Sequence, residues 1–196
     1  MNTEQLRESM TPRAAYEAKQ LHRVPDAPVV SREEFLLERC AGKLVLDIGA
    51  SGPMHDAIVK VAKECWGLDR VSGPKVIACD LDDDLPNIPW DSSYAAPEII
   101  VCGEVLEHLS NPGRFLGKLR SAYPSVLVVI TVPNAFSDAA RKHLANGIEC
   151  VNLDHVCYYS YTTLKELVSR SGYAIRSWRW YNGKPMFAEG LIFVCE

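Results

Sequence analysis

Apolar runs and amphipathic stretches alternate along the chain from residue 31 onwards. Most of the runs contain few polar residues, which is typical of strands that are buried on both faces of a sheet. The predicted strands are residues 43–48, 65–69, 75–80, 97–103, 125–132, 174–180 and 191–196. Apolar side chains recur at helical spacing between them, and the predicted helices are residues 31–40, 57–62, 115–119, 138–145 and 162–172.

Strands separated by helices predict an α/β fold, in which a doubly wound, mainly parallel sheet of seven strands carries helices on both faces. Only a loop separates the last two strands, so we expect one antiparallel strand near the C-terminus. Residues 1–30 are polar and contain several prolines, and they predict an N-terminal arm or lid. Residues 31–196 are expected to form a single domain.

Composition and charge narrow the possible partners. The chain has 196 residues, a net charge of -4 and no basic tract, so we expect no nucleic acid as a partner. The N-terminal residues lack the pattern of a signal peptide, and the longest apolar run is too short to cross a bilayer. We therefore expect a cytoplasmic protein without membrane insertion, and nothing in the pattern specifies its oligomeric state. The seven cysteines include no C-x-x-C pair, which favours buried free thiols over a zinc site or a disulfide framework.

The sequence LVLDIGASGP, residues 44–53, places a glycine-containing loop directly after a predicted strand. Ligands bind beyond the carboxyl ends of the strands in such sheets, and glycine lets the backbone approach them closely. A phosphate-binding P-loop is excluded, because none of the three Gly-Lys pairs is followed by Ser or Thr. The G-x-G-x-x-G pattern of a dinucleotide site fails at its second and third glycines. Asp47 would repel a pyrophosphate, whereas its carboxylate suits a cationic ligand.

This loop resembles the first motif of the class I S-adenosylmethionine-dependent methyltransferases, whose sheet is Rossmann-like. Further segments resemble the same family, namely VIACDLDDDLP, IIVCGEVLEHLSNP, VVITVPNAF and NLDHVCYYSYTTLKELVSRSGYAI. The resemblance covers residues 43–196 and implies S-adenosylmethionine as the cofactor. The cofactor-binding residues that it implies are Asp47, Gly49, Ala50, Ser51, Asp69, Asp80, Leu81, Gly103 and Glu104.

The resemblance also implies how this set divides over the cofactor. Asp69 would accept hydrogen bonds from both ribose hydroxyls, and Asp80 would accept one from the adenine amino group. The backbone of Leu81 would lie along the adenine ring. Gly103 and Glu104 would lie beside the methionine end of the cofactor.

The substrate side is expected to lie beyond the fourth of the predicted strands. His108 and Tyr158 are the candidate substrate-side residues, although His108 also fits a helix start whose side chain is bonded locally. The rim of the cleft is expected to come from residues 1–30, 135–153 and 181–189. Residues 82–84 predict a solvated acidic turn rather than a divalent-metal site, and we expect no metal in the protein.

Methyl transfer is an in-line displacement at a methyl group that the sulfonium already activates, so the protein mainly places the nucleophile and excludes water. The expected acceptor is an oxygen, nitrogen or carbon atom of a small molecule or a glycan intermediate. His155 is the candidate catalytic base, because imidazole titrates near neutrality, and a structural loop histidine is the alternative. Adjacency in the sequence does not make Asp154 the residue that orients His155, because adjacent side chains in a strand point in opposite directions. The other histidines, His22, His55 and His143, are given no role.

Two residues of the glycine loop depart from the family pattern. Ser51 and Pro53 stand where many relatives have glycine. The Ser51 hydroxyl could bind the cofactor's carboxylate, and Pro53 fits the first turn of a helix. Because both residues tighten the loop, a catalytically lapsed cofactor-binding or scaffold protein of the same fold is an alternative. A nucleotide-dependent oxidoreductase is a further alternative.

Overall fold

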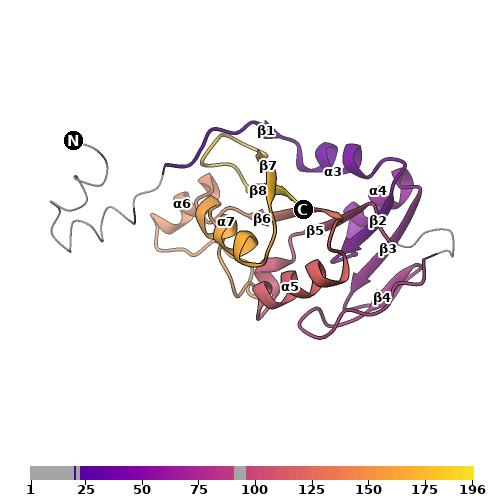
Figure 1. Cartoon of the computed structure of the whole chain (residues 1–196). Coiled ribbons are helices and arrows are strands. Elements are labelled where there is room, and N and C mark those ends of the chain that lie inside the picture. The colour runs from indigo at the N-terminus through magenta and orange to yellow at the C-terminus, as the bar shows by residue number, and fades with distance from the viewer. Residues whose placement is uncertain (1–19, 21–22, 91–95) are drawn as a thin grey trace, which may run out of the picture.

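The structure, a computed structural model, describes residue 20 and residues 23–90 and 96–196. Within these residues, eight strands form one sheet in the order β1-β7-β8-β6-β5-β2-β3-β4 (Figure 1). The elements in chain order are β1 (Val29–Val30), α3 (Arg32–Cys40), β2 (Leu44–Ile48), α4 (Gly52–Val61), β3 (Glu64–Asp69), β4 (Val76–Ala78), β5 (Ile99–Gly103), the short 3-10 helix η1 (Leu106–His108), α5 (Pro112–Ala122), β6 (Leu127–Pro133), α6 (Asp138–Leu144), α7 (Tyr161–Arg170), β7 (Ile175–Tyr181) and β8 (Gly190–Cys195).

The pairing of the strands confirms the predicted fold class. β2 pairs in parallel with β3 and β5, and the parallel pairing continues from β3 to β4 and from β5 to β6. β8 is antiparallel to both of its neighbours, β6 and β7. The sheet has one strand more than the seven predicted, because Val29 and Val30 pair in parallel with β7. Two residues are too few to produce a recognisable period in the sequence.

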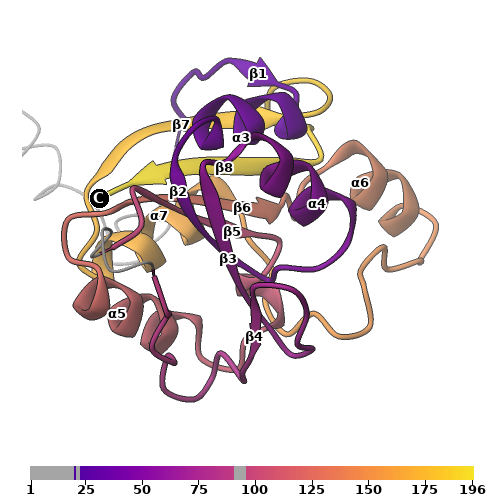
Figure 2. The same ribbon diagram turned by 90° about the vertical axis from the view of Figure 1, so that its right-hand side faces the viewer.

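Helices cover both faces of the sheet (Figures 1 and 2). All five residues of β2 are buried, and successive side chains belong to different apolar cores. Leu46 and Ile48 pack in one core with α5 and α7, whereas Val45 packs in the other with α3 and α4. This double burial is the reason that the strand reads as a continuous apolar run.

Helix ends in the structure follow local signals in the sequence. The Ser31 hydroxyl caps α3 by accepting a hydrogen bond from the backbone N–H of Glu34 at 3.3 Å. Pro53 lies in the first turn of α4, where its missing N–H has little cost. Gly172 follows the end of α7 with φ at +87°, a conformation that glycine adopts without strain.

Two further findings concern the surroundings of the fold. No helix in the described part of the chain is long and apolar enough to cross a membrane. All seven cysteines are free, and four of them, Cys40, Cys65, Cys102 and Cys195, are buried, where burial raises the pKa of each thiol. The predicted N-terminal arm falls largely on residues 1–19 and 21–22, which lie outside the described residues.

Candidate active site

A pocket of about 250 Å³ opens where the central parallel strands end. We call it the strand-end pocket. Its lining includes many of the residues that the sequence singled out for the cofactor or the substrate side, together with a few of their neighbours. The residues are Gly49, Ser51, Asp69, Arg70, Asp80, Leu81, Glu104, Val105, His108, Leu109 and Asp154. Most of them come from the carboxyl ends of β2, β3 and β5 and from the loops after β2, β3, β4 and β5, because parallel strands present their carboxyl ends at one edge of the sheet. Asp154 comes from the segment between α6 and α7.

The glycine loop between β2 and α4 forms one wall of this pocket. The backbone N–H groups of Gly49 and Ala50 both donate to the carbonyl of Leu68, at 2.8 and 3.1 Å. Gly49 has φ at +76°, and a Cβ atom on it would lie 2.5 Å from Cγ2 of Val105, so only glycine fits this position. Ser51 is exposed at the N-terminus of α4, and its side chain makes no capping hydrogen bond.

Asp47 lies beneath the loop and does not line the strand-end pocket. Its carboxylate is 5% exposed, and Oδ2 lies 2.8 Å from Nδ1 of His55, a residue to which the sequence assigned no role. The hydrogen bond that the carboxylate of Asp47 accepts from His55 raises the pKa of His55, while burial raises the pKa of Asp47 itself. The carboxylate that precedes the glycines therefore ties β2 to α4. No motif in the sequence marks this pair, because the two residues lie on different elements.

Carboxylates dominate the charge of the strand-end pocket. Asp69, Asp80, Glu104 and Asp154 line it, against a single guanidinium, that of Arg70. Two of these carboxylates also order their own loops: Oδ1 of Asp69 accepts the N–H of Val71 at 3.2 Å, and Oδ1 of Asp80 accepts the N–H of Asp82 at 3.0 Å. Such a site favours a ligand that carries positive charge or hydroxyl donors over one that carries phosphates.

The acidic run at residues 82–84 is only in part a solvated turn. Asp83 is exposed, and the exposed Asp84 lies 3.0 Å from the ammonium of Lys118. Asp82, in contrast, accepts the backbone N–H groups of Ser110 and Asn111, at 3.1 and 3.2 Å. Burial acts to raise the pKa of Asp82, but these hydrogen bonds outweigh it and lower the pKa. Asp82 thereby fastens the loop after β4 to the segment that follows η1.

Glu104 is held in a strained and well-defined position at the end of β5. Its φ of +56° is uncommon for a residue with a side chain, and such backbone strain is concentrated at functional sites. Oε1 accepts hydrogen bonds from the hydroxyl of Thr131 at 2.8 Å and from the hydroxyl of Tyr181 at 3.0 Å. Gly103, the preceding residue, is partly buried near the guanidinium of Arg32.

A second pocket, of about 410 Å³, lies on the other side of η1. We call it the loop pocket, because residues 133–159 supply most of its lining. Tyr158 lines it, with its hydroxyl 2.5 Å from a carboxylate oxygen of Glu149. Glu107 and His155 also line the loop pocket, while their chain neighbours His108 and Asp154 line the strand-end pocket. The two pockets therefore share a wall.

Backbone hydrogen bonds build this wall. The carbonyl of Glu107 accepts the N–H groups of Val156 and Cys157, at 2.8 and 3.2 Å, and the hydroxyl of Tyr159 donates to the carbonyl of Leu106 at 3.2 Å. These contacts bring His155 against η1, although almost fifty residues separate them in the chain. The sequence could not reveal this proximity.

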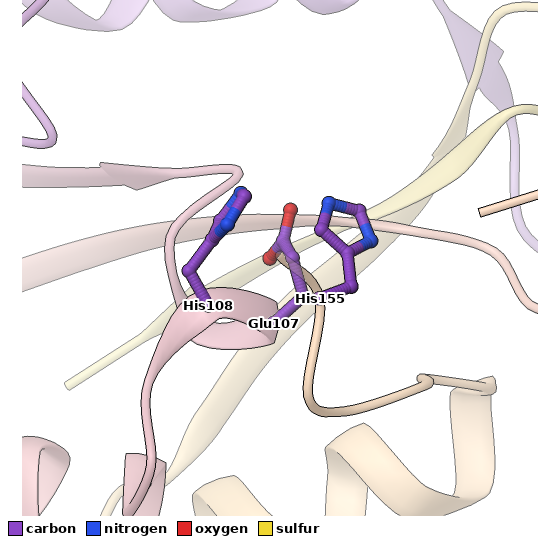
Figure 3. A group of neighbouring side chains, drawn as sticks. All are labelled: Glu107, His108 and His155. Atoms are coloured by element: carbon purple, nitrogen blue, oxygen red, sulfur yellow. The ribbon is translucent and has the colours of Figure 1, made fainter. Parts of the chain in front are cut away.

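Three side chains meet in the shared wall (Figure 3). The rings of His108 and His155 have centroids 4.5 Å apart and are nearly perpendicular. Asp154 interacts with His108 rather than with His155, since its Oδ2 lies 3.0 Å from Nδ1 of His108. Glu107 is 1% exposed, and neither of its carboxylate oxygens has a hydrogen-bond partner.

The electrostatics of this wall are unusual. Burial and the nearby charge of Glu104 raise the pKa of Glu107 to about 8. Burial and the neighbouring His108 lower the pKa of His155, which keeps its imidazole neutral at pH 7. A neutral imidazole has a lone pair that can accept a proton or bind a metal ion.

Comparisons with known proteins agree with this geometry. A family model described as a methyltransferase domain matches residues 21–177. Among solved structures, the small RNA methyltransferase HEN1 is 16% identical with a TM-score of 0.66, and the match covers 90% of this chain but only 27% of HEN1. An S-adenosylmethionine-dependent methyltransferase from Mesorhizobium loti is 15% identical with a TM-score of 0.59, and the match covers 83% and 96% of the two chains.

A third similar structure was solved with bound ligands. The 1,6-didemethyltoxoflavin-N1-methyltransferase of Burkholderia thailandensis, solved with its substrate and S-adenosylhomocysteine, is 16% identical with a TM-score of 0.57. That match covers 83% of this chain and 75% of the other. No curated protein matches the chain.

Proposed function

The chain belongs to the methyltransferase domain family, and from this premise we propose that it transfers a methyl group from S-adenosylmethionine, bound in the strand-end pocket, to an acceptor bound in the loop pocket. The proposed acceptor atom is an oxygen, nitrogen or carbon of a small molecule or a glycan intermediate. The charge of the strand-end pocket supports the cofactor, and the shared wall supports the transfer to an acceptor in the loop pocket.

The charge of the strand-end pocket is the observation that supports S-adenosylmethionine. The cofactor brings a sulfonium, an ammonium and ribose hydroxyls, all of which suit the carboxylates of Asp69, Asp80 and Glu104. Its single carboxylate would lie at the N-terminus of α4, where the backbone N–H groups and the Ser51 hydroxyl can donate to it. A dinucleotide would instead bring two phosphates toward the same acids. The charges therefore disfavour the oxidoreductase alternative.

The loop pocket supports a small acceptor with an apolar part. Its volume of about 410 Å³ falls within the usual range for small-molecule sites. Two of the large apolar side chains that are exposed on the described surface, Ile148 and Tyr158, line it. The absence of nucleic acid among the partners stays a prediction, because one similar structure methylates RNA.

The shared wall suggests how the two substrates would meet. In methyl transfer, the acceptor atom attacks the methyl carbon in line with the leaving sulfur, so the two ligands must approach through a single opening. His155 lines the loop pocket next to this boundary. In the metal-free protein we keep it as the candidate catalytic base, since its neutral imidazole offers a lone pair.

Calorimetric titration with S-adenosylmethionine and S-adenosylhomocysteine tests the proposal. We expect the wild-type chain to bind both, and Asp69→Asn to weaken binding about 10- to 100-fold, which corresponds to about 1.4–2.8 kcal/mol lost with the ribose contacts. Asp56→Asn is the matched control, because Asp56 is exposed on α4 and does not line the pocket. Absence of binding at high micromolar cofactor, or binding of a nicotinamide dinucleotide in its place, would refute the proposal. Tight binding without turnover on a broad acceptor panel would favour the lapsed form.

A further inference from the structure

We propose that Glu107, His108 and His155 form a binding site for one late first-row divalent cation, such as Zn²⁺ or Co²⁺, in the wall between the strand-end pocket and the loop pocket. One ligand atom from each residue lies within 4.8 Å of the others. From the sequence alone we expected no metal and weighed one only at residues 82–84, so the proposed site differs from that candidate in both place and composition.

The spacing of the three ligand atoms is close to what a bound cation requires. Carboxylate oxygens and imidazole nitrogens lie about 2.0–2.2 Å from such an ion, which places any two ligands about 3–4 Å apart. The observed limit of 4.8 Å therefore needs only small rotations of the side chains to close around an ion. Figure 3 shows the carboxylate of Glu107 next to the imidazole rings of His108 and His155, in agreement with this limit.

Glu107 provides the strongest reason to expect a ligand at this point. Its side chain is almost completely buried, and both carboxylate oxygens lack a hydrogen-bond partner. Buried carboxylates are nearly always paired, hydrogen-bonded or bound to a metal, because burial of an uncompensated charge is strongly unfavourable. A cation next to Glu107 and the two histidines would bind these oxygens directly, whereas no described protein group forms a hydrogen bond with them.

His108 is already oriented as metal-binding histidines are. Its Nδ1 lies 3.0 Å from Oδ2 of Asp154, so Nδ1–H can donate to that carboxylate and leave Nε2 free to bind an ion. His155 is positioned independently, because the carbonyl of Glu107 accepts the N–H groups of the two residues that follow it. The orientation of His108 and the backbone position of His155 thus depend on contacts that need no metal.

The donor set and the surrounding charges indicate the kind of cation. Two imidazoles and one carboxylate suit Zn²⁺, Fe²⁺ or Co²⁺, whereas Mg²⁺ and Ca²⁺ prefer an all-oxygen shell. Glu104 and Asp154 add negative charge near the site and would further favour a divalent ion, while the guanidinium of Arg32 is the nearby opposing charge.

The location of the site gives the cation a function, which rests on the proposed methyl transfer. An acceptor hydroxyl in the loop pocket could bind the ion as a further ligand, and the ion would lower the pKa of that hydroxyl. His155 would then bind the ion and not the proton, so the proton would leave to solvent. The oxygen would form a bond to the methyl carbon, and the bond from that carbon to sulfur would break. The products would be a methyl ether and the neutral thioether S-adenosylhomocysteine.

Titration of the full-length, metal-free protein with Co²⁺, followed by its visible absorption, tests the site directly. We expect one equivalent to bind with the spectrum of nitrogen and oxygen ligands, and Zn²⁺ to displace it. Glu107→Gln and His155→Asn should each weaken Co²⁺ binding at least about tenfold, and Asp154→Asn, which only loses the orientation of His108, about 10- to 100-fold. Asp83→Asn is the matched control at an exposed residue that lines neither pocket, and it should bind Co²⁺ as the wild type does.

Several outcomes would overturn the proposal. The first is that neither Co²⁺ nor Zn²⁺ binds at high micromolar concentration. The second is that Glu107→Gln and His155→Asn leave the binding unchanged. The third is a spectrum dominated by thiolate ligands, which would assign the ion to cysteines. Circular dichroism and thermal unfolding confirm that each variant is folded, and His155, which is only partly buried, serves if Glu107→Gln does not fold. Titration with S-adenosylhomocysteine in the absence of metal separates the two proposals, because loss of cofactor binding refutes the methyltransferase and loss of Co²⁺ binding refutes only the metal site.

Discussion

Alanine at Gly49 should impair both stability and cofactor binding, whereas alanine at Gly52 should affect stability alone. The two glycines have nearly the same backbone conformation, with φ at +76° and +74°. Their surroundings differ, because a Cβ atom on Gly49 would lie 2.5 Å from Cγ2 of Val105, while one on Gly52 would meet nothing within 4 Å. The pair therefore separates the cost of the backbone conformation from the cost of the steric overlap.

The magnitudes follow from these two terms. A left-handed conformation costs a residue with a side chain about 1–2 kcal/mol, and this is the whole loss expected at Gly52. At Gly49, overpacking adds about 1–3 kcal/mol, so the total is about 2–5 kcal/mol. Val105 cannot easily yield, since it is buried and its β-branched side chain has few rotamers. The melting temperature should fall by about 2–4 °C for each kcal/mol.

Urea unfolding and calorimetric titration with S-adenosylhomocysteine measure both effects. We expect Gly49→Ala to weaken the cofactor at least about tenfold, or about 1.4 kcal/mol, because a displaced Val105 disturbs the wall of the strand-end pocket beside Glu104. Gly52→Ala should keep the affinity within about threefold. Equal losses of stability in the two variants would refute the argument that the contact with Val105 requires glycine at residue 49.

Two further predictions concern buried polar contacts. His55→Gln should lower the free energy of unfolding by about 3 kcal/mol, because it leaves the buried carboxylate of Asp47 without its partner. Because the pKa of His55 is raised in the folded state, its contribution is complete below about pH 6.5 and is lost as the pH rises through the raised value. Urea unfolding between about pH 6 and 9 should show this fall in the wild type, and the same fall in His55→Gln would contradict it. Tyr181→Phe should cost about 1–2 kcal/mol in the same assay, since Glu104 loses one of its two hydroxyl donors and keeps only that of Thr131. An unchanged unfolding midpoint would show that the Tyr181 bond contributes nothing.

Much of the fold could be predicted because its signals are local. Continuous apolar runs such as that of β2 reflect burial on both faces, and the loop between the last two strands is too short for a helical crossover. The short strand β1 was missed, since its pairing with β7 is decided by tertiary contacts and not by any period in its two residues. Helix α6 was predicted at residues 138–145 and runs over Asp138–Leu144.

The site was predictable where a motif fixes the backbone, and not where side chains from distant segments meet. Gly49, Asp69 and Asp80 line the strand-end pocket because each lies at or just beyond the carboxyl end of a parallel strand. In contrast, the partners of Asp47 and His108 depend on where α4 and the segment near residue 154 pack. Side-chain pairing across elements has no sequence period.

The loop after β4 illustrates the same limit. Residues 82–84 have one composition but three different surroundings, with Asp83 exposed, Asp84 beside Lys118 and Asp82 bound to two backbone N–H groups. Composition alone suggested a solvated turn. The distinction comes from the approach of the segment at Ser110, which only the folded chain supplies.

The thin wall formed by η1 and the segment around His155 has a thermodynamic consequence. Adjacent residues of one short turn line different pockets. If the proposed function holds, an acceptor that orders this turn would change the free energy with which the methyl donor binds, and the donor would change acceptor affinity by the same factor. The two substrates would then bind with reciprocal cooperativity, so that occupancy of one pocket would change the affinity measured at the other.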